Sequence, residues 1–194
     1  MAGTTSDDAI AQQLDELLHR TVRRLQESGA RTEALARYEE RRPLLGIRRG
    51  PVMRPLGRVW RLGVLLLDTD AGLHTIGLVT RALEPGRVTN QSARAEERRD
   101  HRRAAFQAKF AEGDTVNFDT APVATDAAGL RAATESGAGV LQLFTPASPE
   151  TASAPTPGDA DDPSATPPVL VRWNRLPGDG GLTPLAPYLA ERAE

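Results

Sequence analysis

Arginine is the residue type whose number and spacing give this sequence its main chemical potential. In the segment 92–112, arginines recur at intervals of four residues and two more flank that row: Arg94, Arg98, Arg102, Arg99 and Arg103. An interval of four places side chains on one face of a helix. Guanidinium groups bind carboxylate and phosphate oxygens through paired hydrogen bonds. The segment therefore predicts a helix with a cationic ridge that binds anions.

A second group of arginines lies between residues 41 and 61. The anion-binding candidates in this group are Arg41, Arg42, Arg48, Arg49, Arg54 and Arg58. Trp60 lies among them, and an aromatic ring next to arginines can stack on a nucleic-acid base. However, Trp60 alternates with Leu62 and Val64, a pattern typical of the buried face of a strand. We therefore expect Trp60 in the core.

The abundance of arginine also has a plainer explanation. Of the 24 basic residues, 23 are arginine, as expected of a protein from a GC-rich genome. On this view, segment 92–112 is an ordinary exposed helix whose arginines pair with Glu96, Glu97 and Asp100. The distribution of charge favours an anionic partner instead, because residues 20–109 carry 20 bases and 10 acids. Residues 110–194 carry only 4 bases against 12 acids.

Most other kinds of reactive site have no recognisable motif in this chain. The absence of cysteine excludes disulfides, thiol nucleophiles and iron–sulfur clusters. The three histidines, His19, His74 and His101, stand far apart, so no zinc motif is predicted. Phosphate-binding, dinucleotide-binding and nucleophile-elbow motifs are also lacking. We predict no metal and no cofactor, and the sequence identifies no catalytic residue.

The elements that must position the arginines predict an α+β fold. An apolar stripe at spacings of three and four predicts an N-terminal amphipathic helix that Gly29 ends. Segment 32–42 predicts a short helix, with a short edge strand as the alternative. Aliphatic runs at 56–67 and 73–83 predict a β-hairpin (56–83), with Gly72 at positive φ in its loop.

The remaining elements complete a small antiparallel sheet of about four strands with the basic helix 92–112 packed near it. Asn90 or Ser92 is expected to cap that helix, and Gly113 is expected to end it. The other expected elements are a strand at 115–118, a helix at 126–136, paired strands at 140–144 and 169–173, and a helix at 183–192. Segment 145–168 holds 7 of the 15 prolines and is predicted to be a disordered insertion. The expected organisation is a helix at 1–29, an α+β core at 30–144 and 169–194, and the insertion.

Targeting signals are not apparent in the sequence. The N-terminal ten residues lack a cationic segment followed by an apolar run. The longest central apolar run is far shorter than the roughly 20 residues that a membrane helix needs. We therefore expect a soluble, cytoplasmic protein without a membrane partner.

One stretch of the chain resembles a known group of proteins. It reads RRGPVMRPLGRVWRLGVLLLDTDAGLHTIGLVTRALEPG and is followed by NQSARAEERRDHRRAAF and FAEGDTVNFD. These phrases resemble a family of small uncharacterised proteins of high-GC bacteria, some of which carry the label glutaminase. Serine-dependent glutaminases have an S-x-x-K site, whereas Phe106 precedes Lys109 by three residues here. The residues therefore do not support the label, and no catalytic residue is carried over.

Three functional hypotheses follow. The first is a non-enzymatic binding module whose arginine-rich surface holds an anionic partner, either nucleic acid or an acidic protein. The second, implied by the resemblance, is a glutaminase-like amidohydrolase that converts glutamine to glutamate and ammonia. The third is a structural module that forms a homodimer through the apolar face of the N-terminal helix.

Overall fold

The structure is a computed structural model that describes residues 2–41, 50–84, 92–144, 168–174 and 181–193. These residues form four helices and nine strands. The chain divides into two compact units, which are described separately. Unit 1 comprises Met1–Ala30, Leu62–Thr75 and Pro122–Glu194, and unit 2 comprises Arg31–Arg61 and Ile76–Ala121. In the part of the chain that is described, no helix combines the length and apolarity needed to cross a membrane.

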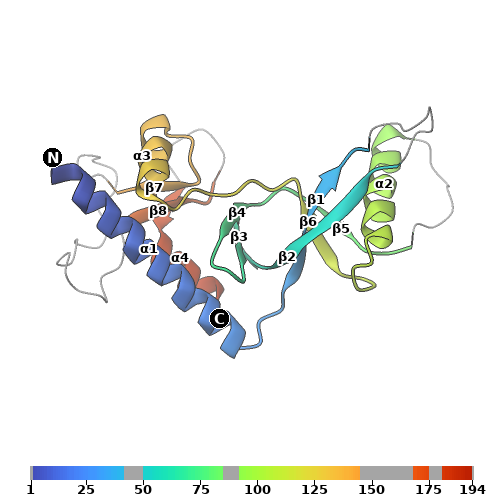
Figure 1. Cartoon of the computed structure of the whole chain (residues 1–194), viewed down its shortest axis with the longest axis horizontal. Helices are drawn as coiled ribbons and strands as arrows, with labels where there is room; N and C mark the ends of the chain where they lie inside the picture. The colour runs from blue at the N-terminus through green and yellow to red at the C-terminus, as the bar shows by residue number, and fades with distance from the viewer. Residues whose placement is uncertain (1, 42–49, 85–91, 145–167, 175–180, 194) are drawn as a thin grey trace. The chain divides into compact units, whose positions relative to one another are not determined.

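Unit 1 is built on helix α1 (Ala2–Glu27), which contacts α3 (Ala127–Ser136) and α4 (Leu185–Arg192) (Figure 1). The predicted apolar stripe of α1 lies in the core of this unit, with Leu14, Leu18, Val22 and Leu25 all buried. Gly29 follows the helix at a φ of 65°, as expected of a C-terminal glycine. The helix begins at Ala2 and ends at Glu27. An ion pair between Asp7 and Arg131 joins α1 to α3.

A three-stranded antiparallel sheet completes the C-terminal part of unit 1. Its strands are β7 (Leu141–Leu143), β8 (Val169–Arg172) and β9 (Leu182–Pro184), in that order. The pairing of β7 with β8 confirms the predicted antiparallel pair. Apart from Pro168, the predicted insertion 145–168 lies outside the described residues.

The predicted loop between two strands joins β3 (Leu65–Asp68) to β4 (Leu73–Thr75), which pair antiparallel. The expectation of positive φ at Gly72 is wrong, because Ala71 adopts it, with a φ of 65°. Gly72 is needed for space, since a Cβ there would lie 2.5 Å from the Asp68 carboxylate. That carboxylate accepts the N–H groups of Asp70 (2.9 Å) and Gly72 (2.7 Å), and His74 Nε2 lies 2.9 Å from it. The pair of Asp68 and His74 thus closes the loop.

Helix α4 is held in unit 1 by a tyrosine hydroxyl. Tyr188 Oη accepts the Val64 N–H at 2.9 Å and donates to the Leu62 carbonyl at 3.2 Å. The intervening Gly63 has a φ of 62°, and a Cβ at this position would collide with Tyr188 Oη. Gly63 therefore meets two requirements, a left-handed backbone and close approach of the hydroxyl.

Replacing Gly63 with alanine should destabilise the protein by about 2–3 kcal/mol, because left-handed strain adds to the collision with Tyr188. Gly29→Ala is the matched control, since Gly29 has nearly the same φ and no described atom lies within 4 Å of a Cβ built there. The control should cost only about 1 kcal/mol. Denaturant unfolding of both variants measures the difference, and equal costs contradict the role assigned to Tyr188.

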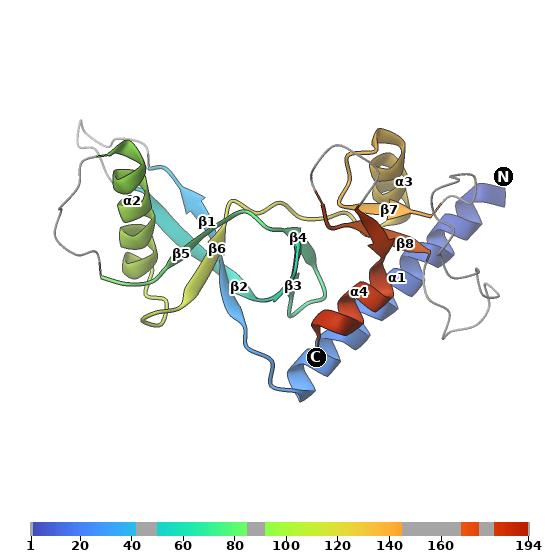
Figure 2. The same ribbon diagram turned by 180° about the vertical axis from the view of Figure 1, so that it is seen from behind.

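Unit 2 contains a sheet of mixed direction and one helix (Figure 2). Its strands are β1 (Glu33–Glu39), β2 (Val52–Leu62, of which Leu62 belongs to unit 1), β5 (Leu78–Arg81) and β6 (Thr115–Phe118). They lie in the order β2-β1-β6-β5. Strand β1 is antiparallel to β2 and parallel to β6, and β5 is antiparallel to β6. Helix α2 (Ala93–Gln107) contacts β5.

The α+β class is confirmed, but several finer expectations are wrong. Segment 32–42 contains strand β1 rather than a helix, and β1 is central because it pairs on both edges. The sheet is not wholly antiparallel, and nine strands are described rather than about four. The run 56–67 ends one strand and starts another, and the run 73–83 contains two strands. A residue at positive φ, Gly63, interrupts the first of these runs.

Small side chains allow α2 to pack closely on the sheet of unit 2. Ala104 and Ala105 are buried in a core with Ala34, Ala36 and Phe118, among others. Ser92 caps the helix as expected, because its hydroxyl accepts the Ala95 N–H. The helix ends at Gln107 rather than at Gly113. Trp60 is only 4% exposed, which confirms its predicted place in the core.

Candidate anion-binding site

The charges of α2 are arranged in rows of like sign. The pairs four residues apart are Arg94–Arg98, Arg98–Arg102, Arg99–Arg103 and Glu96–Asp100. Like charges at this spacing destabilise a helix by about 0.2–0.5 kcal/mol per pair. Within the described chain, the one ion pair that α2 makes joins Asp100 to Arg103 at 3.1 Å. This pair is one of those that the plainer explanation of the arginines expects, whereas Glu96 and Glu97 form no ion pair with any described residue.

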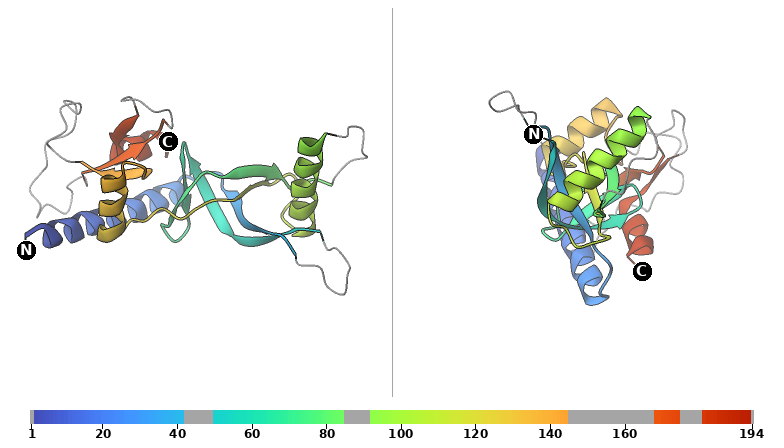
Figure 3. Two further views of the ribbon diagram at one scale, coloured as in Figure 1. Left: turned by 90° about the horizontal axis from the view of Figure 1, so that it is seen from above. Right: turned by 90° about the vertical axis from the view of Figure 1, so that its right-hand side faces the viewer.

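Two of these arginines contribute to a pocket between α2 and β5, which lie next to each other in unit 2 (Figure 3). The pocket has a volume of about 280 Å³. Its lining residues are Val79, Thr80, Arg81, Leu83, Arg98, His101 and Arg102. Arg81, Arg98 and Arg102 are exposed and form no ion pair with any described residue. The lining of the pocket thus includes three arginines that have no ion-pair partner among the described residues, together with one histidine.

Aromatic contacts hold the imidazole of His101 in place. Its ring centroid lies 5.0 Å from that of Tyr38 and 4.7 Å from that of Phe118, with edge-to-face geometry in both contacts. Burial raises the pKa of Tyr38, and the nearby carboxylates of Asp100, Glu40 and Glu97 raise it further. Tyr38 therefore stays protonated and neutral beneath the histidine. The two ring contacts of His101 therefore depend on the packing of α2 against β1, which carries Tyr38, and against β6, which carries Phe118.

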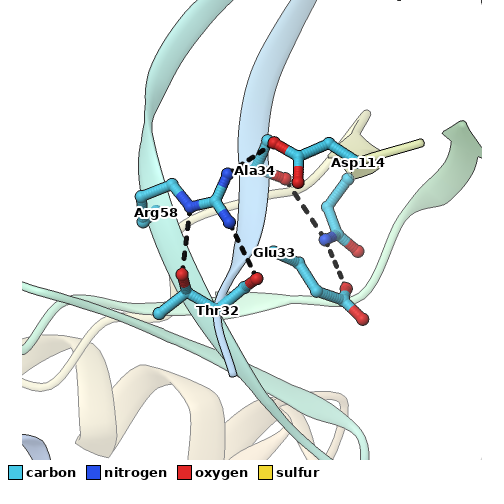
Figure 4. Close-up of polar contacts among 6 residues, drawn as sticks. Thr32, Glu33, Ala34, Arg58 and Asp114 are labelled. Carbon is cyan, nitrogen blue, oxygen red and sulfur yellow. Dashed lines mark hydrogen bonds and ion pairs between the residues drawn. The ribbon is translucent and has the colours of Figure 1, made fainter. Parts of the chain in front are cut away.

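The arginines of β2 are engaged within unit 2 instead. Arg54 Nε lies 2.6 Å from the Glu39 carboxylate in an exposed ion pair. Arg58 donates to Asp114 Oδ2 at 2.7 Å and to the hydroxyl and carbonyl oxygens of Thr32 at 3.0 and 2.9 Å (Figure 4). Each of the three guanidinium nitrogens of Arg58 therefore has an acceptor within unit 2. Neither residue lines the pocket.

A buried amide connects the strands beside Arg58. Asn117 is fully buried, and its side-chain nitrogen donates to Glu33 at 2.7 Å and to the Ala34 carbonyl at 3.3 Å. Its oxygen accepts a hydrogen bond from Arg61, which also contacts Glu33 at 3.2 Å. These contacts join β1, β2 and β6 through side chains. They fix β6, the strand against which β5 pairs.

The predicted anion-binding residues therefore separate into five groups. Arg98 and Arg102 line the pocket, while Arg94, Arg99 and Arg103 belong to α2 outside its lining. Arg54 and Arg58 hold internal partners, and Arg41 is exposed after β1. Arg42, Arg48 and Arg49 lie outside the described residues.

Sequence reasoning missed the contribution of β5. Arg81 and His101 were not among the anion-binding candidates, although both line the pocket. The signal for His101 was present, because it lies three residues from Arg98 and therefore on the same face of a helix. No comparable signal exists for Arg81, because its proximity to α2 arises only when β5 pairs with β6.

Two other kinds of site gain no support from the described residues. Within the described segments, no three histidine, aspartate or glutamate side chains are arranged to hold a metal ion. The apolar face of α1 that the dimer hypothesis uses is largely buried inside unit 1, since Leu14, Leu18, Val22 and Leu25 are 0–6% exposed. That face is therefore occupied by the chain itself.

Replacing Asn117 with alanine should destabilise the protein by about 2–3 kcal/mol, because Glu33 and Arg61 lose a buried partner. Arg54→Ala is the control, because it breaks an exposed ion pair of the same unit and should cost at most about 1 kcal/mol. Thermal and denaturant unfolding compare the two variants. A cost for Asn117→Ala no larger than that of the control contradicts the structural role of this amide.

Comparison of this chain with known proteins found no match. No family model matches the chain, and neither a curated protein nor a solved structure does so. A function for this chain must therefore be argued from the residues of its own candidate site.

Proposed function

We propose that this chain is a non-enzymatic binding module whose α2–β5 pocket holds an anionic group of a partner molecule. The observation that carries the proposal is the convergence of Arg81, Arg98 and Arg102 on one pocket without a carboxylate partner among the described residues. Positive charges that line one pocket repel one another, and a bound anion offsets that repulsion. Guanidinium groups also bind carboxylate and phosphate with matched geometry.

The size of the pocket limits what enters it. A volume of about 280 Å³ lies just below the range of about 300–1,000 Å³ typical of pockets for small-molecule ligands. A carboxylate or phosphate group fits such a space. The proposed ligand is therefore an anionic group projecting from a larger partner.

The charge of the two units agrees with this assignment. Over its whole sequence, unit 2 carries 17 basic and 10 acidic residues, a net charge of +7. Unit 1 carries 7 basic and 16 acidic residues, a net charge of −9. The proposed site thus belongs to the positive unit, whose field attracts anionic partners.

The two other hypotheses stay predictions. Hydrolysis of glutamine is tested directly by measuring ammonia release from the purified protein. Dimerisation through α1 is tested by light scattering. No geometric feature of the described residues favours either of them over anion binding.

The variant Arg98→Gln/Arg102→Gln should weaken the binding of anionic probes by at least tenfold, because each charge-assisted hydrogen bond contributes about 1.5–3 kcal/mol. Suitable probes are fluorescent deca-glutamate and fluorescent deca-thymidylate, measured by anisotropy at several salt concentrations. For the oligonucleotide, the slope of log affinity against log salt should fall by about 1.4, the value for two lost phosphate contacts.

Arg20→Gln/Arg54→Gln is the matched control, because it removes the same charge from two exposed arginines that already have carboxylate partners. Its binding should remain within about twofold of the original protein. Equal weakening by both double variants would show that net charge, and not the pocket, governs binding, and the proposal would then be wrong.

A further inference from the structure

Strand β5 has a free edge next to the candidate site. It is the last strand in the order β2-β1-β6-β5, so no described strand pairs with its outer edge. The Ala82 N–H donates to the Asp114 carbonyl at 3.0 Å, which identifies this pair as a hydrogen-bonded one. Hydrogen-bonded pairs alternate along an antiparallel ladder, so Thr80 bonds to β6 whereas Val79 and Arg81 direct their backbone groups outward.

Three backbone groups are consequently available on this edge. They are the N–H and the carbonyl of Val79 and the N–H of Arg81. The carbonyl of Arg81 is already used, because it accepts the Leu83 N–H at 2.9 Å. Exposed strand edges of this kind accept an extended peptide as an additional strand.

The pocket follows this edge. Its lining includes the consecutive residues Val79, Thr80 and Arg81. Successive side chains of a strand point to opposite faces, so a pocket lined by three consecutive residues of an edge strand also reaches the backbone of that strand. Arg98 and Arg102 of α2 form the other side of the same pocket. Residues of the β5 edge and the arginines of α2 therefore line the same pocket.

Exposed aliphatic side chains accompany these polar groups. Leu78 is 47%, Val79 50% and Leu83 36% exposed. Edge strands usually carry features that discourage pairing, such as lysine, proline or a bulge. Here the edge strand combines aliphatic side chains with positive charges. A partner that satisfies both features alternates acidic and aliphatic residues.

We infer that β5 binds an extended acidic peptide segment of a partner protein as an added strand, with peptide carboxylates at Arg98 and Arg102. This inference rests on the proposed function and names its ligand class. Nucleic acid fits less well, because single strands are bound mainly by stacking on aromatic rings. The one ring in the pocket lining is that of His101, which already contacts Tyr38 and Phe118.

The test uses the full-length protein and a fluorescent ten-residue peptide of alternating glutamate and valine. A second peptide has the same sequence but is N-methylated at every residue, which removes its N–H donors and keeps its charge. We expect the methylated peptide to bind at least tenfold more weakly. Hydrogen exchange of the Val79 and Arg81 amides should slow when the unmethylated peptide binds.

Val79→Pro tests the same edge from the protein side, because proline removes an outward N–H and breaks no bond to β6. Leu182→Pro is the matched control. The Trp173 N–H donates to the Gly181 carbonyl, so Leu182 also faces outward on an edge strand, but in the sheet of unit 1. Val79→Pro should weaken peptide binding at least tenfold, whereas the control should bind within about twofold of the original protein.

The outcomes separate the inference from the proposed function. Equal binding of the two peptides, or unchanged binding by a folded Val79→Pro variant, overturns strand addition and leaves arginine-dependent anion binding intact. Tighter, Arg98- and Arg102-dependent binding of deca-thymidylate identifies nucleic acid as the partner and also overturns the inference. If no probe depends on these two arginines, both the inference and the proposed function are wrong. The comparison of the two peptides applies even if Val79→Pro fails to fold.

Discussion

The close contact of two alanines with the sheet of unit 2 determines where the charges of α2 point. Ala104 and Ala105 are buried against residues of β1 and β6, and this contact fixes the rotation of the helix about its axis. Arg98, His101 and Arg102 precede Ala105 by seven, four and three residues, so they share its face. Burial of Ala105 therefore brings these three residues to the sheet at β5. Larger side chains at 104 and 105 would move the helix away, because packed interiors tolerate little added volume.

The position of β5 depends in turn on the polar contacts of β6. Asn117 forms hydrogen bonds with groups of β1 and β2 and has no exposed surface. A buried amide with partners stabilises one arrangement of the strands, since any other arrangement leaves its polar groups without hydrogen bonds. Val116 and Phe118, on either side of Asn117, are buried on the opposite face with the alanines of α2. One strand thus joins the polar network to the surface that carries α2.

The sequence predicted local features of this fold better than its long-range pairings. Helix α2, its cap at Ser92 and the pair β7–β8 follow from periodicity and capping residues. The parallel pairing of β1 with β6 does not, because about 75 residues separate these strands and no local pattern encodes their contact. Segment 32–42 was mistaken for a helix because the spacing of Leu35 and Tyr38 fits a helical turn. Burial of Ala34, Leu35 and Ala36 in succession instead fits a central strand covered on both faces.

For the candidate site, too, the sequence predicted local features and not the contacts that depend on the fold. The row of Arg94, Arg98 and Arg102 is visible in the sequence as a spacing of four. Arg58 has the same side-chain chemistry, but the fold places it next to Asp114 and Thr32, which occupy it. The type and spacing of residues therefore identify possible ligands for an anion, whereas the partners that the fold supplies decide which of them are free.

Positive charge at a free strand edge affects association in two opposite ways. A second copy of β5 would bring another Arg81, and another α2 with Arg98 and Arg102, against the same charges, so edge-to-edge pairing of two copies is disfavoured. Pairing with an acidic strand is favoured instead, because its carboxylates form ion pairs with these arginines. Its backbone also forms hydrogen bonds with β5 in place of hydrogen bonds with water. Aliphatic side chains at Leu78 and Val79 add affinity for either strand without discriminating between them. In the proposed complex, therefore, the arginines determine which strand binds, and the backbone and aliphatic contacts determine how tightly it is held.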